Sequence, residues 1–207
     1  MKNWKTIPVP NKMKDLPTER GYPIPVIILH DETGKAHFKI NDSRKVDMCM
    51  YENLCTICGN GLGDDKWMIG GPVSAFHPGG VYVDAPVHKE CGEYALQVCP
   101  YLAVSRYTQQ IDIEKLGTLK FDGGEGYGFV NMTQSEERVP FFVFSKIKKY
   151  EVHRRDYNKY LVPEKPYLEI EYWNEGERIS KEAAGMLFKR WQEETKDFKN
   201  VGKFNII

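Results

Sequence analysis

The chain has 207 residues, of which 41% are hydrophobic, 13% aromatic and 28% charged. This composition is typical of a globular protein with a buried core and excludes an intrinsically disordered chain. Lysine plus arginine equals aspartate plus glutamate at 29 each, so the chain as a whole has no basic field that collects nucleic acid. No run reaches the roughly 18 apolar residues of a membrane span, and the N-terminus lacks the apolar core of a signal peptide. We therefore expect a cytoplasmic protein with no membrane partner.

Residues 1–48 form the first of three segments with different patterns. The first twenty residues are rich in proline and lysine and have no sustained period, which predicts an extended arm. The runs Val26–His30 and Ala36–Ile40 then flank a short loop that contains glycine. Two strand-like runs around such a loop predict a β-hairpin.

Residues 49–105 contain all five cysteines of the chain. An odd number of cysteines without an export signal favours reduced thiols and metal ligation over a disulfide framework. The β-prone runs Trp67–Ile69 and Val81–Val83 are separated by glycine and proline, so we predict a second hairpin there. Apolar residues recur with helical spacing from Cys91 onward, which predicts a helix that begins near His88.

Residues 106–207 change in character toward strands and a last helix. Phe141–Phe144 is a continuous apolar run and Tyr167–Trp173 alternates, so both are predicted strands. Ser180 is the expected N-cap of a final amphipathic helix, which makes this segment α+β. We expect the three segments to form one compact α+β unit.

Two pairs of ligand-type residues carry the metal prediction: Cys55 with Cys58, and His88 with Cys91. A CxxC pair can sit on a tight turn, and residues at i and i+3 in the first turn of a helix point the same way. Three thiolates and one imidazole complete a tetrahedral Zn²⁺ site, and a closed set of four protein ligands indicates a structural ion. We call the turn at Cys55–Gly59 the knuckle. The order of knuckle, hairpin and helix is that of a treble-clef module, so residues 49–105 are predicted to form a treble-clef-like zinc-binding module.

The sequence alone leaves other assignments of the metal ligands open. Cys49 or Cys99 can replace His88 as the fourth ligand; otherwise Cys99 is interpreted as a core residue and Cys49 as a spare thiol. His77 and Asp84 bracket the expected central hairpin and could hold a second, catalytic metal ion. This arrangement would make the protein a metal-dependent nuclease or another enzyme that acts on nucleic acid.

A basic stretch with interleaved tyrosines lies between the two C-terminal strand runs. Such a composition can follow a phosphate backbone and stack bases, although runs of this kind are more often solvated faces. The cationic residues of this candidate nucleic-acid surface are Lys146, Lys148, Lys149, Arg154, Arg155 and Lys159.

Five segments, which together touch most of the chain in order, carry a resemblance to a known family: Arg20–Pro25, Leu54–Gly63, Gly71–Pro72, Ala85–Leu102 and Trp173–Ser180. In these segments the chain resembles an uncharacterised family of small proteins encoded by phages and by bacterial genomes that carry prophages. The resemblance implies zinc ligands at Cys55, Cys58, His88 and Cys91, and a phage-related origin with action inside a bacterial host cell. The family has no established activity. The chain differs from the family pattern at Asp64–Lys66 and in its lysine-rich middle.

The leading hypothesis from the sequence is therefore a phage-related, zinc-binding protein without enzymatic activity. A rigid zinc module can present a surface to a host or phage macromolecule, most simply a protein. The competing hypothesis is the metal-dependent nuclease described above, which requires a second cluster of ligands.

Overall fold

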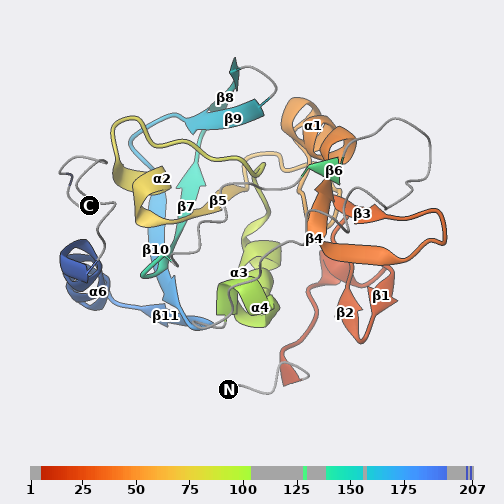
Figure 1. Cartoon of the computed structure of the whole chain (residues 1–207), viewed down its shortest axis with the longest axis horizontal. Coiled ribbons are helices and arrows are strands. Elements are labelled where there is room, and N and C mark those ends of the chain that lie inside the picture. Colours follow the sequence, from red (N-terminus) through yellow and green to blue (C-terminus); the bar gives the residue numbers. More distant parts are fainter. Residues whose placement is uncertain are drawn as a thin grey trace.

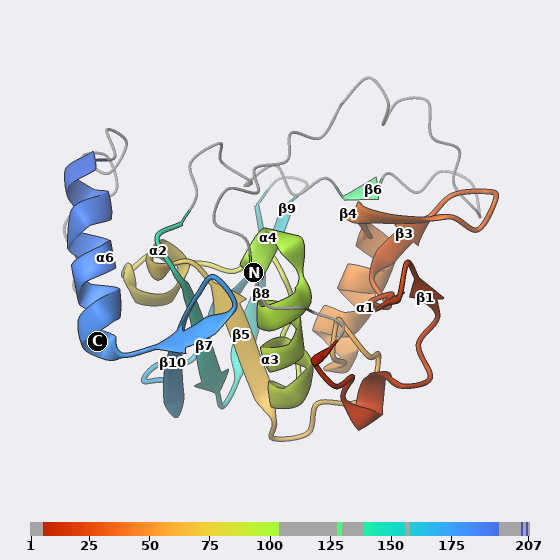
Figure 2. The same cartoon turned by 90° about the horizontal axis from the view of Figure 1, so that it is seen from below.

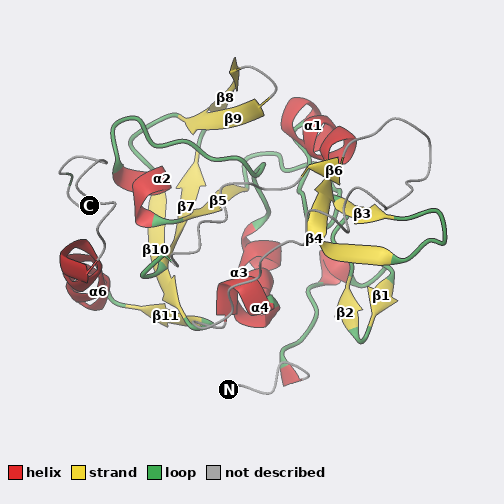
Figure 3. Cartoon of the chain, viewed as in Figure 1, coloured by secondary structure: helices red, strands yellow, loops and turns green. Residues whose placement is uncertain are grey.

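The structure is a computed structural model that describes residues 6–103, 128–129, 139–155, 158–194, 204 and 206. Helices and several small antiparallel sheets are mixed along the chain, so the predicted α+β class is confirmed. A four-stranded sheet occupies one side of the molecule and the N-terminal strands lie on the other (Figures 1 and 3). No helix among the described residues is both long enough and apolar enough to cross a membrane.

The N-terminal part contains the predicted β-hairpin. Leu29 pairs with His37 and His30 pairs with Ala36, and the Asp31 carboxylate closes the loop by accepting hydrogen bonds from Thr33. The elements of this part are a 3₁₀ helix at Asn11–Met13, β1 Thr18–Glu19, β2 Tyr22–Pro23, β3 Ile28–His30, β4 Ala36–Asp42 and the short partner of β4, β6 Gly128–Phe129.

Helix α1, Ser43–Glu52, follows β4 directly and was not predicted. The Asp42 side chain accepts a hydrogen bond from the Arg44 N–H at 3.0 Å, and Asn53 ends the helix in the left-handed region with φ of 56°. Helix α1 therefore runs through the boundary between the first two sequence segments.

The central sheet has the strand order β11-β10-β7-β5, and all its pairs are antiparallel. The predicted strands at Phe141–Phe144 and Tyr167–Trp173 are its two middle strands. The bounds are β5 Lys66–Gly70, β7 Phe142–Ile147, β10 Glu169–Asn174 and β11 Glu177–Ile179. Two sequence segments thus share one sheet, because β5 belongs to the middle segment and the others to the last.

Alternate residues of β7 face the two sides of this sheet. Phe142 and Phe144 join the core that contains the cysteine residues, whereas Phe141 and Val143 pack against the helices on the opposite face. Helix α3 lies between the sheet and the N-terminal elements in both views, and α6 lies at the far end (Figures 1 and 2). The helices of this half are α2 Pro72–Phe76, α3 Lys89–Val98, α4 Pro100–Ala103 and α6 Lys181–Glu194.

The prediction of a hairpin from Trp67–Ile69 and Val81–Val83 is wrong. The first run lies in β5, but β5 pairs with β7, and α2 intervenes before residues 81–83. Those residues form no strand, and Tyr82 makes only an isolated bridge with Leu161. The apolar Phe142–Ile147 run offers β5 more buried partners than a return strand from the same loop, so the long-range pair forms instead.

A two-stranded ribbon carries three of the six cationic residues of the basic stretch, namely Arg154, Arg155 and Lys159. Its strands are β8 Tyr150–Arg155 and β9 Asn158–Pro163, which pair antiparallel. Leu161 faces inward and is fully buried. Tyr150, at the start of β8, connects the ribbon to α1, because its hydroxyl donates to Met50 O at 2.7 Å.

Candidate metal centre

The four predicted ligands come together in one buried group. The thiol sulfurs of Cys55, Cys58 and Cys91 and a ring nitrogen of His88 all lie within 4.8 Å of one another. Their residues are between 0% and 8% exposed. Four donor atoms this close can be reached by one ion, because zinc binds sulfur at about 2.3 Å and nitrogen at about 2.0 Å. The group is therefore a candidate metal centre, and His88 rather than a further cysteine completes it.

A tight turn after α1 brings the first two thiols together. Gly59 has φ of 76°, and its N–H donates to Cys55 O at 2.8 Å, so the chain reverses between the two cysteines and residue 60. Leu54 and Gly61 form a bridge across the base of the turn. A side chain at position 59 would also meet Val26 Cγ1 at 3.1 Å, which gives a second reason for glycine.

Residues 87–91 bring the second pair to the same place. Val87 exchanges two backbone hydrogen bonds with Trp67 of β5, at 2.8 and 2.9 Å, and this fixes the approach of the chain to α3. His88 is the N-cap residue of α3 and Cys91 lies in its first turn. The predicted helix start is thereby confirmed to within one residue.

Asp65 holds the start of α3 from outside the helix. One of its carboxylate oxygens accepts from the Lys89 N–H at 3.1 Å, and the other accepts from Trp67 Nε1 at 2.8 Å. The carboxylate accepts a hydrogen bond from an otherwise unpaired N–H at the helix start, and its negative charge interacts favourably with the positive end of the helix dipole. The sequence around Asp65 does not indicate this role, because a cap supplied from 24 residues away leaves no local pattern.

The hydrogen bond of His88 selects which ring nitrogen faces the sulfurs. His88 Nε2 lies 3.1 Å from Gly61 O, so Nε2 carries the proton and donates to that carbonyl. Nδ1 is left with its lone pair and lies 3.4 Å from Cys58 Sγ. A tetrahedral ion with ordinary bond lengths separates a sulfur and a nitrogen ligand by about 3.6 Å, which the observed spacing matches closely.

Hydrogen bonds to the sulfurs favour negative charge within the group. The thiols of Cys55 and Cys91 and the Asn60 N–H point at the Cys58 sulfur, and they hold the pKa of Cys58 far below its ordinary value. The hydrogen bonds of Cys91 with Cys55 and Cys58, followed by burial, raise the pKa of Cys91. Three thiols confined to one buried place cannot all ionise without a cation, and a divalent metal ion would supply the missing charge.

The candidate metal centre is part of the largest hydrophobic cluster among the residues that the structure describes. Its three cysteines share a cluster with Trp67 and Phe144, whose rings lie 4.6 Å apart between centroids. Met13 of the N-terminal arm is 2% exposed and belongs to the same cluster, and Lys12 Nζ lies 2.5 Å from Glu90 on α3. The site therefore joins the arm, the knuckle, α3 and the sheet.

The two spare cysteines lie elsewhere. Cys49 is fully buried on α1, where burial raises its pKa to about 11. Cys99 is the C-cap residue of α3, at the opposite end of the helix from Cys91. Neither belongs to the ligand group found among the described residues, so the open alternative to His88 is not supported.

His77 and Asp84 do not build a second site in the part of the chain that the structure describes. His77 follows α2, and its Nδ1 accepts a hydrogen bond from the Gly79 N–H at 3.0 Å. Burial raises the pKa of Asp84, which favours the neutral carboxyl over a metal ligand. Within residues 6–103 and the described parts of the C-terminal half, the only group of three or more metal-ligating side chains is the Cys₃His group.

The basic stretch is partly neutralised by nearby carboxylates. Lys146 Nζ lies 3.1 Å from Glu169, and Lys159 pairs with Asp47 of α1 while its ammonium lies 5.3 Å above the Tyr51 ring. Lys148 and Lys149 are exposed beside the turn into β8. Arg154 lines a groove next to α1, and the side chain of Arg155 lies outside what the structure describes. Binding of nucleic acid here stays a prediction.

Comparisons of the chain with protein-family models, with curated proteins and with solved structures find no match to any of them.

Proposed function

We propose that the protein is a phage-related, zinc-binding interaction protein without enzymatic activity, which acts on a host or phage macromolecule. In this proposal a structural Zn²⁺ ion holds the arm, the knuckle and α3 against the sheet, and the rigid unit presents a binding surface. The observation that carries the proposal is the buried Cys₃His group, whose four donor atoms lie within 4.8 Å of one another.

The donor chemistry favours zinc over other common ions. Three sulfurs and an imidazole are soft and borderline ligands, which select zinc and disfavour magnesium and calcium, since these ions take oxygen ligands. The group contains no carboxylate. The Nε2–H bond of His88 to Gly61 O also gives the imidazole the outer partner that metal-bound histidines usually have.

A structural role fits better than a catalytic one. Catalytic zinc keeps a position for water or substrate, whereas four protein ligands complete the tetrahedron. All four residues are buried within the core. The resemblance to the phage family supports the phage-related origin and, through it, a partner in the bacterial cell. The absence of a second ligand group within the described residues supports a binding role over the nuclease alternative.

Elemental analysis of purified variants tests the metal part of the proposal. We expect one zinc per chain in the unaltered protein, and loss of most of it in Cys58→Ser and Cys91→Ser. Cys49→Ser and Cys99→Ser remove thiols of the same type outside the group and should keep the zinc. Equal zinc content in all four variants would overturn the assignment.

A cleavage assay tests the absence of enzymatic activity. Protein loaded with zinc is incubated with DNA and RNA in the presence of Mg²⁺ or Mn²⁺, beside a His77→Ala variant. No cleavage above the buffer control is expected from either protein. Cleavage that disappears in His77→Ala would replace the interaction protein by a nuclease.

A further inference from the structure

One edge of the central sheet is only half covered. Strand β10 pairs with β7 over five residues, Glu169–Trp173, but β11 pairs with β10 only over Tyr172–Asn174. After Ile179, opposite Tyr172, the chain leaves the sheet and enters α6. Among the described residues no other strand adjoins this side of β10, so Glu169–Glu171 form an open edge.

The pairing pattern shows which backbone groups point outward. The two residues between β10 and β11, Glu175 and Gly176, both have positive φ, at 50° and 76°, as in a type I′ turn. Such a turn closes on a hydrogen-bonded pair, here Asn174 with Glu177. By alternation Tyr172 also bonds to β11, and the N–H and C=O of Ile170 point to the open edge.

The other side of the sheet gives the same register. Trp67 of β5 directs its N–H and C=O away from β7, toward Val87. The residues of β7 that bond to β5 are therefore Val143, Ser145 and Ile147, and those that bond to β10 are Phe142, Phe144 and Lys146. Their partners on β10 are Trp173, Glu171 and Glu169, which again leaves Ile170 facing outward.

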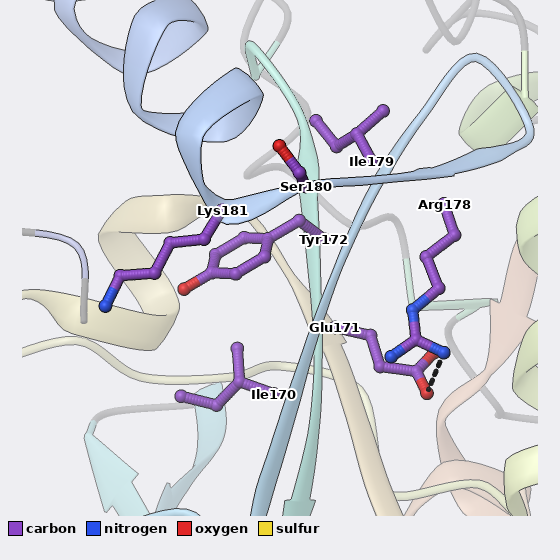
Figure 4. Close-up of a pocket in the computed structure, with 7 residues that line it drawn as sticks. All are labelled: Ile170, Glu171, Tyr172, Arg178, Ile179, Ser180 and Lys181. Carbon is purple, nitrogen blue, oxygen red and sulfur yellow. Dashed lines mark ion pairs between the residues drawn. The ribbon is translucent and has the colours of Figure 1, made fainter.

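A cleft of about 450 Å³ lies beside this edge. Side chains from both faces of the sheet reach it, with Ile170 and Tyr172 on one side of the β10 ribbon and Glu171 on the other (Figure 4). Its remaining wall is formed by Arg178 and Ile179 at the end of β11, by Ser180, and by Lys181 at the start of α6.

The charges around the cleft favour an acidic occupant. The Glu171 carboxylate is 3% exposed and is already neutralised by Arg178 at 3.2 Å and Lys89 at 3.3 Å. Lys181 lies on the opposite side of β10 from this pair, at the first turn of α6, where the helix dipole adds to its positive charge (Figure 4). Leu168 is 57% exposed just before the open residues and offers apolar contact.

We propose that the open edge of β10 binds an extended segment of a partner protein by strand addition, and that it prefers a segment with acidic side chains. The added strand continues the line of β11, bonds to the N–H and C=O of Ile170, and places a carboxylate near Lys181. This inference rests on the proposed function as an interaction protein, and it names the class of partner.

Amide hydrogen exchange of the zinc-loaded protein tests whether the edge is open. The Ile170 amide should exchange rapidly, while the amides of Glu171 and Tyr172, which bond to β7 and β11, should be protected. Protection of Ile170 at every protein concentration would show that the edge is covered. Protection that grows with protein concentration would show that a second copy of the chain occupies it. Either result overturns the proposal.

A pair of synthetic peptides tests the occupant. One is a capped heptapeptide of alternating valine and glutamate, and the other has lysine in place of glutamate. In NMR titrations the acidic peptide should shift the resonances of Ile170, Arg178 and Lys181 and bind about threefold more tightly than the basic one. Equal affinities, shifts confined to other residues, or no binding at all would contradict the proposal.

Two variants separate the contribution of the Ile170 backbone to peptide binding from that of its side chain. Ile170→Pro removes the outward N–H without removing a bond to β7, and we expect about tenfold weaker binding of the acidic peptide. Ile170→Ala removes most of the side chain but keeps the N–H, and it should bind more tightly than the proline variant. Equal loss in the two variants would exclude strand addition. These results leave the zinc assignment untouched, whereas a protein without zinc or with nuclease activity would remove the proposed function instead.

Discussion

His88 donates its Nε2–H to the carbonyl of Gly61 at 3.1 Å, and this bond turns Nδ1 toward the sulfur of Cys58. The Gly61 carbonyl, which follows the knuckle, therefore fixes the tautomer of His88, the candidate ligand at the start of α3. The two halves of the centre, 30 residues apart between Cys58 and His88, are in this way already oriented toward each other by the protein's own hydrogen bonds.

Loss of the imidazole should weaken metal binding and open the coordination shell. In His88→Ala we expect the zinc affinity to fall by at least about tenfold, because water replaces a protein ligand. His77→Ala removes a histidine that caps a turn away from the centre and should leave the affinity unchanged. Competition with a chromophoric chelator measures both. Equal affinities in the two variants would remove His88 from the site.

The contact between α3 and the sheet should tolerate no additional side chain at Gly92. A Cβ there would lie 2.5 Å from the Phe144 ring, so Gly92→Ala should lower the free energy of unfolding by about 1–3 kcal/mol. Gly185→Ala places the same methyl group in α6, where its nearest neighbour is Ile206 Cδ1 at 3.9 Å. That variant should gain about 0.5–1 kcal/mol from helix propensity. Urea unfolding of the zinc-loaded proteins measures both values.

A destabilisation by Gly185→Ala equal to that by Gly92→Ala would show that the close approach of α3 to β7 is not what restricts position 92.

Removal of the metal should release the N-terminal arm. Met13 packs in the core cluster that contains the cysteines, so a chelator that extracts the ion should loosen both together. Trypsin should then cleave faster after Lys12 and Lys14, as followed by mass spectrometry of timed digests. Cleavage after Arg190 provides the internal reference, because this exposed residue lies on α6, whose buried side chains belong to a separate cluster. Uniform acceleration at all three sites would indicate global unfolding rather than local release.

The N-terminal hairpin should lose stability in acid. The Thr33 hydroxyl and the His37 ring hold the pKa of Asp31 well below its ordinary value of 3.8. A carboxyl with a lowered folded pKa stabilises the protein at neutral pH, and this contribution fades as pH falls below about 4 toward the folded pKa. Melting temperatures of the unaltered protein and Asp31→Ala should differ at pH 7, and this difference should shrink steadily between pH 4 and pH 2. A constant difference would contradict the role of the charge.

The ligand set was predictable because its information is local. CxxC on a turn with glycine and a His-x-x-Cys pair at a helix start each need only a few consecutive residues, and the structure places all four side chains together as expected. The hairpin around Asp31 and the N-cap role of Ser180, whose hydroxyl accepts from the Ala183 N–H at 3.2 Å, were predicted for the same reason.

Long-range pairing was not predictable in the same way. Nothing near Trp67 in the sequence indicates that β5 pairs with a strand about 75 residues later, because the choice depends on which apolar surfaces are buried together. The Asp65 cap of α3 and the Gly61 acceptor of His88 are also long-range contacts. Helix α1 was missed although Asp42 is a suitable N-cap, because β4 runs into it without a turn.

X-ray absorption at the zinc edge of the purified protein tests the central claim most directly. We predict one zinc ion per chain, surrounded by three sulfur atoms at about 2.3 Å and one nitrogen at about 2.0 Å, with no bound water. A protein that contains no transition metal, or an ion coordinated mainly by oxygen, would contradict the account.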